Sequence, residues 1–172
     1  LYPLHKGGMY TINGALTLTL INNRTIYVQG LNGGGVSSSF SGNTSDSASV
    51  ILNGCEFSSA VNINDQYSIR SFIYYSTFNG QVALDACELI GNTFNGQVNI
   101  NPNNAQFAFP PSIKIYANNF SYSATQLNMY YADFSNIHIA NNFFYYTNSS
   151  NNISLYGNNK VDKVIIENNI FK

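Results

Sequence analysis

Apolar and polar residues alternate in short segments along most of the chain. This period of two indicates strands with one buried face and one wet face. No 11-residue window shows the period of an amphipathic helix, so the pattern predicts strands and turns throughout. The alternating apolar pairs are Val82/Leu84, Val98/Ile100, Ile113/Ile115, Leu127/Met129, Ile137/Ile139 and Ile153/Leu155.

Several of these segments are copies of one another. Residues 78–84 and 94–100 nearly coincide at a step of 16 residues, and 57–63 keeps the same Phe-to-Val spacing. Antiparallel sandwiches are not self-similar at a fixed phase, whereas a parallel coil places the same residue type at the same point of every rung. The sequence therefore predicts an all-β, single-domain parallel β-helix, or β-solenoid, with a stacked aliphatic and Phe core.

Asn recurs beside the end of the predicted strands, often just before an aromatic residue. Asn tolerates the left-handed backbone of a tight corner, and its amide can bond to an Asn one rung away. We therefore expect Asn-rich turns with the following Phe stacked inside the coil. The expected ladder consists of Asn92, Asn119, Asn142 and Asn169, with Asn118 as the alternative to Asn119.

The I-x-I-x-N-N-x-F rungs, as in 164–171, resemble those of the right-handed parallel β-helix (pectin-lyase-like) superfamily. The resemblance covers about residues 50–172. Proteins with many different functions share this rung pattern, so the resemblance implies the fold more than an activity.

Three regions are expected within the one domain. Residues 1–31 contain two alternating segments, 16–21 and 25–28, which predict strands of a first rung or cap. Residues 32–49 are rich in Gly and Ser without an apolar period, which predicts a flexible loop. Residues 50–172 hold the rungs.

The last rung, 164–171, is as apolar as the others, and only Lys172 follows it. Solenoid ends are normally capped because they expose strand edges and core. We expect either that the chain was cut or that a second copy continues the stack, docking on residues 16–21 to form a filament.

Composition narrows the function. The chain has 7 basic and 8 acidic residues among 172, against 28 Asn and 28 Ser or Thr. There is no basic stripe for nucleic acid, and no apolar run long enough to span a membrane. A surface of amides and hydroxyls suits an extracellular, cell-surface or virion location.

Cys55 and Cys87 fall at different phases of the repeat and are expected to be buried thiols.

The resemblance implies polysaccharide lyases and hydrolases, which use clustered carboxylates. No two acidic residues are adjacent here, and the sequence shows no recognisable catalytic site. Asp65, Arg70 and Asp85 are the residues from which an active site would have to be built, with Arg70 and Asp85 alternatively forming a surface ion pair. No cofactor is expected.

Metal and modification sites are equally sparse. His5 and His138 are far apart and no His/Cys/Asp cluster has ligand spacing, so no metal site is expected. The number of glycosylation sequons is what the Asn-rich composition gives by chance. The candidate acceptors are Asn23, Asn43, Asn119, Asn148 and Asn152.

Tyrosines gather in the C-terminal half, and a row of exposed rings flanked by Asn can stack against sugars. Tyr116, Tyr130 and Tyr156 are the candidate ligand contacts, although such rings can equally pack on each other. We expect a non-catalytic extracellular structural or adhesive β-solenoid, such as a surface filament, an envelope protein or a virion spike. The alternative is a module that binds or cleaves a polysaccharide.

Overall fold

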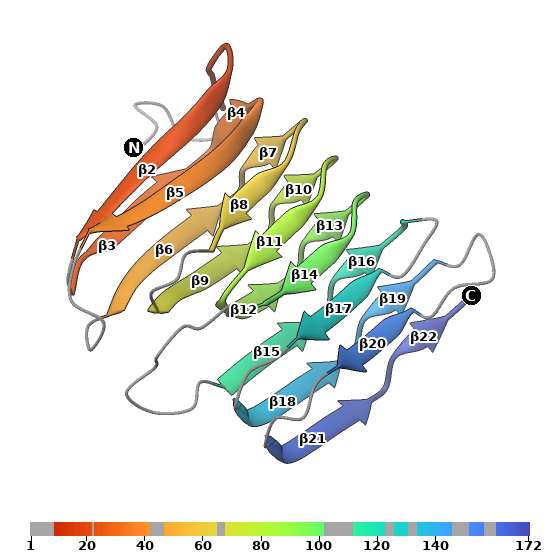
Figure 1. The fold of residues 1–172 in the computed structure, drawn as a ribbon. Coiled ribbons are helices and arrows are strands. Elements are labelled where there is room, and N and C mark those ends of the chain that lie inside the picture. Colours follow the sequence, from red (N-terminus) through yellow and green to blue (C-terminus); the bar gives the residue numbers. More distant parts are fainter. Residues whose placement is uncertain are drawn as a thin grey trace.

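The computed structural model describes residues 9–21, 23–41, 47–64, 68–101, 112–122, 126–130, 134–145, 152–156 and 161–172. Within these ranges all regular secondary structure is β-strand, and every paired strand runs parallel to its neighbour. The strands stack from the N-terminal end to the C-terminal end as one coil (Figure 1). The predicted all-β parallel β-solenoid is confirmed.

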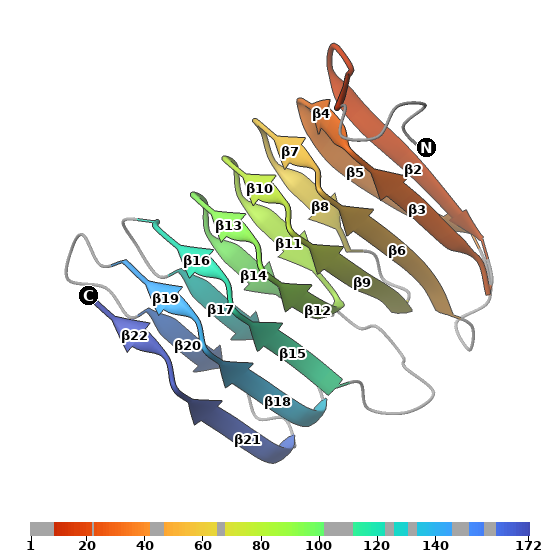
Figure 2. The same ribbon diagram turned by 180° about the vertical axis from the view of Figure 1, so that it is seen from behind.

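Three sheets line the coil, and both faces can be followed when the molecule is turned (Figure 2). Sheet A contains β1 (Tyr10–Thr11), β4 (Leu31–Gly33), β7 (Glu56–Phe57), β10 (Thr77–Phe78), β13 (Thr93–Phe94), β16 (Asn119–Phe120), β19 (Phe143–Phe144) and β22 (Ile170–Phe171). Sheet B contains β2 (Ala15–Ile21), β5 (Gly35–Ser41), β8 (Val61–Ile63), β11 (Val82–Leu84), β14 (Val98–Ile100), β17 (Leu127–Tyr130) and β20 (Ile153–Tyr156). Sheet C contains β3 (Thr25–Gln29), β6 (Ser47–Asn53), β9 (Ser68–Tyr74), β12 (Ala86–Ile90), β15 (Ser112–Tyr116), β18 (Phe134–Ala140) and β21 (Val161–Glu167).

A stack of phenylalanines fills the corner beside sheet A. Neighbouring rings lie 4.7 to 5.8 Å apart between centroids and are nearly parallel, which adds ring–ring contact to the burial of apolar area. The members are Phe57, Phe78, Phe94, Phe120, Phe144 and Phe171. In the rung 137–144, the inward ring is Phe144, and Phe143 faces outward, so the aromatic directly after the Asn pair is not the one that stacks inside.

The Asn ladder lies at the turn from sheet C to sheet A. Each turn has one residue with a left-handed backbone followed by one whose side chain points inward, as in Asn141 and Asn142. Asn92, Asn118, Asn142 and Asn169 form the ladder, and each side-chain oxygen accepts from the residue one rung earlier. Asn92, Asn142 and Asn169 therefore occupy the predicted positions.

The prediction of Asn119 in the ladder is wrong. Asn119 is exposed and belongs to β16, while its neighbour Asn118 is buried and donates to the carbonyl oxygen of Leu89 at 2.9 Å. The left-handed residue of that turn is Ala117, which directs the next side chain, Asn118, into the coil.

The prediction of a flexible loop at 32–49 is also wrong for the described residues 32–41 and 47–49. They belong largely to β4, β5 and β6, and Val36 pairs with Leu16 and Val61. Their small residues serve close packing, because a Cβ on Gly35 would collide with the carbonyl oxygen of Ala60. The predicted strands at 16–21 and 25–28 are confirmed as parts of β2 and β3.

Candidate functional site

The outer face of sheet B carries a column rich in amide side chains, which we call the amide column. Asn62, Ala83, Asn99, Asn128 and Ser154 follow one another in register from β8 to β20. Asn128 donates to the side-chain oxygen of Asn99 at 3.1 Å, so neighbouring amides bind each other along the axis. The face is neutral and hydrogen-bonding.

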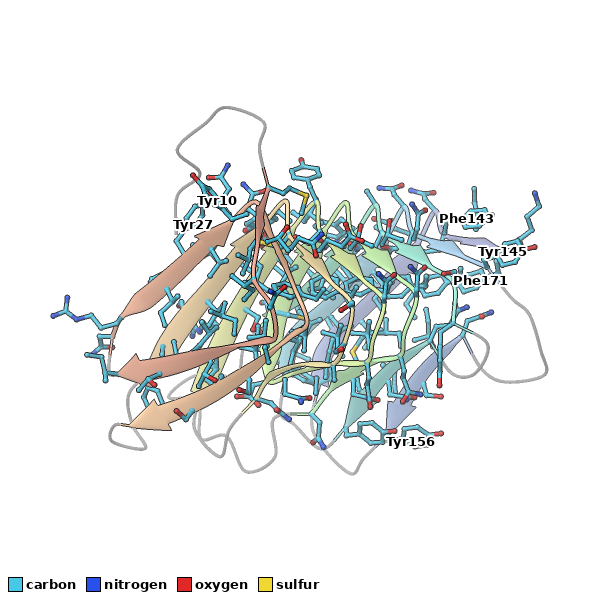
Figure 3. All side chains as sticks on the ribbon, turned by 90° about the horizontal axis from the view of Figure 1, so that it is seen from above. Tyr10, Tyr27, Phe143, Tyr145, Tyr156 and Phe171 are labelled. Atoms are coloured by element: carbon cyan, nitrogen blue, oxygen red, sulfur yellow. The ribbon has the colours of Figure 1, made fainter. Side chains whose placement is uncertain are left out.

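The three candidate ligand tyrosines do not form one site. Tyr130 and Tyr156 are paired on β17 and β20 of sheet B, whereas Tyr116 lies on β15 of sheet C. Figure 3 shows Tyr156 at the outside of the coil, well away from Phe143 and Tyr145. The rings of Tyr130 and Tyr156 stack at 5.3 Å with an interplanar angle of 8°, so each covers one face of the other. Tyr156, the later of the two along the axis, is 53% exposed.

Two of the three candidate catalytic residues, Arg70 and Asp85, belong to the described part of the chain. Asp65 lies outside the described residues. Asp85 is buried at the corner between β11 and β12, and its carboxylate accepts the backbone N–H of Ile69 at 3.2 Å. Arg70 is exposed on the outer face of β9. The Asp85 carboxylate thus binds the backbone of β9 in the preceding rung, which is a structural role.

A group of polar residues that the sequence reasoning missed lies on the outer face of sheet C. The first part is centred on Glu88, which accepts from Tyr74 Oη at 3.1 Å and from Lys114 Nζ at 3.1 Å. These residues come from β9, β12 and β15, three consecutive strands of the sheet. Burial chiefly, and then the hydrogen bond and the negative charge of Glu88, raise the pKa of Tyr74.

The second part is centred on His138. The hydroxyl of Tyr116 lies 2.8 Å from Nδ1 of His138, and Glu167 Oε1 lies 2.9 Å from Nε2. The Tyr116 ring also contacts the imidazole edge to face at 4.9 Å. His138 thus joins β15, β18 and β21 through both ring nitrogens.

Two shallow hollows lie along this face. The first, of about 340 Å³, is lined among others by Arg70, Cys87, Glu88 and Lys114. The second, of about 250 Å³, includes Tyr116, His138 and Lys163. Their charged groups could hold an acidic or polyhydroxylated group by hydrogen bonds.

The carboxylates of this face are poorly placed for glycoside cleavage. Glu88 is on β12 and Glu167 is on β21, three strand steps apart in sheet C. At about 4.8 Å per step the strands are about 14 Å apart, beyond the roughly 5 to 10 Å that separates the carboxyl groups of a glycosidase. The pair therefore has the wrong spacing for general acid–base cleavage.

The cysteines, as expected, are free and buried. Burial raises the pKa of both thiols, and the charge of Glu88 adds to this effect at Cys87. Cys55 lies at the inward turn position that Asn occupies in later rungs, and its backbone N–H donates to Ser76 Oγ at 3.0 Å. Both are therefore packing residues and poor nucleophiles.

Among the described residues, no group of three His, Cys, Asp or Glu side chains could hold a metal ion. His5 lies outside them. Of the candidate glycosylation sites, Asn23 and Asn119 are exposed and Asn152 is half-buried, while Asn43 and Asn148 fall outside the described ranges.

No protein-family model, no curated protein and no solved structure matches the chain. No helix in the described part of the chain is long and apolar enough to cross a membrane. The site is thus interpreted from its own geometry.

Proposed function

We propose that this protein is a non-catalytic extracellular structural or adhesive β-solenoid that associates through its end. It would serve in a surface filament, an envelope or a virion spike, at the cell surface or on the virion. We further propose that the coil is right-handed and of the pectin-lyase-like kind, as the rung pattern at 164–171 suggests.

The observation that carries the proposal is the continuity of axial contacts along the coil, from rung to rung, as far as β22. The Phe stack reaches Phe171 at 5.0 Å from Phe144, and the Asn ladder reaches Asn169. Val164, Ile166 and Phe171 occupy core positions of the rung of β21 and β22 and are nevertheless 45%, 47% and 51% exposed.

The surface chemistry supports an exported protein. Charged residues make up 9% of the chain, and its polar faces are columns of Asn, Ser and Thr. Such faces keep their charge across a wide pH range because few of their groups titrate. The separation of Glu88 from Glu167 and the structural role of Asp85 favour the non-catalytic interpretation.

The experiment is electron microscopy together with sedimentation of the purified protein. We expect particles longer than one coil, with an axial spacing that is a multiple of about 4.8 Å. The variant Ile166→Lys puts a charge at the open rung and is expected to abolish these particles. The control Asn95→Lys puts the same charge on an exposed turn side chain and should leave them intact. Dispersed single coils for the unaltered protein would contradict the proposal.

A carbohydrate-binding or polysaccharide-cleaving module is the second candidate. The observation that favours it is the 53% exposed Tyr156 ring stacked on Tyr130, beside the amide column of sheet B. A glycan screen tests it: Tyr156→Ala should abolish binding, whereas Tyr145→Ala, which removes an equally exposed ring elsewhere, should not. No binding and no release of reducing ends would leave the structural role.

A further inference from the structure

The hollow of about 340 Å³ on the outer face of sheet C lies midway along the coil. Its lining comes from β9, β12 and β15, three consecutive strands that lie side by side (Figure 2). Strands β6 and β18 continue the sheet on either side, so both flanks of the hollow are present in the structure. Its volume is at the lower end of the range for ligand sites, about 300 to 1,000 Å³, and therefore suits one small chemical group.

The hollow exists because a short side chain occupies an outward position between longer ones. Arg70 pairs with Ala86 across β9 and β12. Glu88 pairs with Lys114 across β12 and β15. This second register sets Ala86 opposite Ser112. The methyl group of Ala86 does not fill the space between the Arg70 and Lys114 side chains, so a ligand over Ala86 meets both cations.

Arg70 lines one side of the hollow. It is exposed and, among the described residues, makes no hydrogen bond and no ion pair. In the described part of sheet C, its outward column holds no carboxylate, the other members being Thr25, Ser49, Ala86, Ser112, Asn136 and Lys163. The guanidinium is a planar fork of donors that matches two oxygens of an oxyanion. The β9 side of the hollow is therefore positively charged.

Lys114 lines the opposite side, on β15. Its Nζ donates to Glu88 Oε2 at 3.1 Å, and Tyr74 Oη donates to Glu88 Oε1 at 3.1 Å, so both carboxylate oxygens have a donor. An ammonium group has three donors, and this contact uses one of them. The charged side chains of the lining are Arg70, Lys114 and Glu88, two positive and one negative, which gives a net charge of +1.

A tetrahedral oxyanion matches these two sides better than a carboxylate does. Sulfate and phosphate present oxygens in several directions, so two of them can bind the Arg70 fork while another accepts from Lys114 Nζ. A carboxylate that binds the same fork directs both of its oxygens to the β9 side. The arrangement therefore favours sulfate or phosphate.

We propose that this hollow binds one sulfate or phosphate group, either as the free ion or as a monoester on a larger molecule. Arg70 binds the group from β9, and Lys114 binds it from β15 while Glu88 holds the ammonium in place. Association through the end of the coil plays no part in this site, so the inference goes beyond the proposed function.

A titration followed by nuclear magnetic resonance tests the site. The ¹⁵N-labelled 172-residue chain receives sodium sulfate, with sodium chloride keeping the ionic strength constant because salt screens exposed charges. We expect saturable shifts of the amide resonances of Ala86, Glu88 and Lys114. Arg70→Gln removes the charged fork and is expected to raise the dissociation constant about tenfold, as the loss of a hydrogen bond to a charged group does.

The matched control is Arg24→Gln, which removes the same charge from another exposed arginine, just before β3. Strand β3 is three steps from β12 in sheet C, about 14 Å, which exceeds the Debye length of about 10 Å at 0.1 M salt. This variant should therefore keep the dissociation constant within about twofold of the original. Urea denaturation checks that both variants keep the original stability. Equal losses of affinity in the two variants would overturn the site.

The sign of the effect of Glu88→Gln tests the role of Lys114. This substitution removes a negative charge beside the bound group and frees the ammonium, while an amide oxygen remains for Tyr74 Oη. We expect the dissociation constant to fall about fivefold, the effect of one charge at about 4 Å in water. A rise would overturn the arrangement in which Lys114 binds the group.

Two further probes distinguish a free ion from a group on a larger molecule. Dextran sulfate carries many sulfate esters, and unmodified dextran is its uncharged control. If Arg70→Gln weakens the binding of sulfate and dextran sulfate shows no such dependence, the site is one for a free ion. If Arg70→Gln weakens the binding of dextran sulfate, the group belongs to a larger molecule. If neither probe binds in a way that depends on Arg70, the inference is overturned and the proposed structural role is unaffected.

Discussion

Asn118 donates to the side-chain oxygen of Asn142 twice, from its backbone N–H at 2.9 Å and from its side-chain amide at 3.0 Å. The same amide donates to the carbonyl oxygen of Leu89, and the Asn118 oxygen accepts from Asn92. Each inward Asn thus satisfies buried groups of both neighbouring rungs. The turn is fixed by side chains as well as by the backbone ladder.

Asn118→Ala is therefore expected to be strongly destabilising. It removes four hydrogen bonds and leaves the buried backbone N–H of Asn92 without its partner, while the Asn142 oxygen keeps only the bond from the Asn118 backbone N–H. An unsatisfied buried polar group costs about 1 to 3 kcal/mol, so we expect a loss of about 3 kcal/mol in the free energy of unfolding. Urea denaturation measures it.

The control is the next residue along the chain. Asn119 has an exposed side chain, and Asn119→Ala should change the free energy of unfolding by no more than about 0.5 kcal/mol. Equal losses in the two variants would contradict the ladder assignment.

The Phe stack offers a second matched pair in adjacent residues. Phe144 is fully buried between Phe120 and Phe171, while Phe143 is half-buried on the outer face. Phe144→Ala is expected to cost about 3 to 5 kcal/mol through the cavity it leaves. Phe143→Ala should cost less than about half of that. Thermal unfolding of both variants tests this, and a reversed order would place the wrong ring in the core.

Two glycines allow the need for close packing and the need for a left-handed backbone to be tested separately. A Cβ on Gly96 would collide with the backbone carbonyl of Gly80 in the preceding rung, so Gly96→Ala is expected to cost about 1 to 3 kcal/mol. Gly54 has φ +60° and open space around it, and Asn141 and Asn168 occupy the equivalent turn position with similar φ. Gly54→Asn should therefore stay within about 0.5 kcal/mol of the original chain in urea denaturation. A greater loss for Gly54→Asn than for Gly96→Ala would contradict this account.

Much of the fold could be predicted from the sequence, because the alternation of apolar and polar residues and the repetition of segments each mark individual strands. The registers of sheet B, from Val61 and Val82 to Leu127, are those that aligning the repeats predicts. The choice between Asn118 and Asn119 was harder, since both are Asn and only the backbone of Ala117 decides which one points inward. The strands at 35–41 were missed because Gly and Ser replace the usual apolar residues where rungs approach closely.

The polar group on sheet C was missed for a different reason. Its bonded members are 14 to 29 residues apart in sequence, as in Tyr74–Glu88 and His138–Glu167, and each looks like a lone outward side chain. Aligning the I-x-I strands would have superposed Lys114 on His138 and revealed the column. The chemistry of a solenoid face depends on stacking register, which is more informative than proximity in sequence.

The buried thiol of Cys87 gives a pH dependence whose sign is fixed. Burial, with the charge of Glu88 as a smaller cause, raises its pKa far above that of an unfolded cysteine, about 8.5. Below pH 8.5 the thiol is protonated in both states, so it does not make the free energy of unfolding depend on pH. Above it the unfolded chain loses the proton and the folded chain keeps it, so stability falls as the pH rises, by about 1.4 kcal/mol per pH unit.

The measurement compares the original chain with Cys87→Val in urea between pH 7 and pH 10. Cys87 occupies an inward position that is Ile113 in the next strand, so Val keeps the packing while removing the titrating group. We expect the free energies of unfolding of the original chain and of Cys87→Val to change in parallel up to about pH 8.5. Above that pH the two values diverge, because the variant loses less stability. Parallel curves up to pH 10 would mean that Cys87 ionises as readily in the folded coil as in the unfolded chain. Its side chain would then have to reach solvent on the Glu88 face, contrary to its burial.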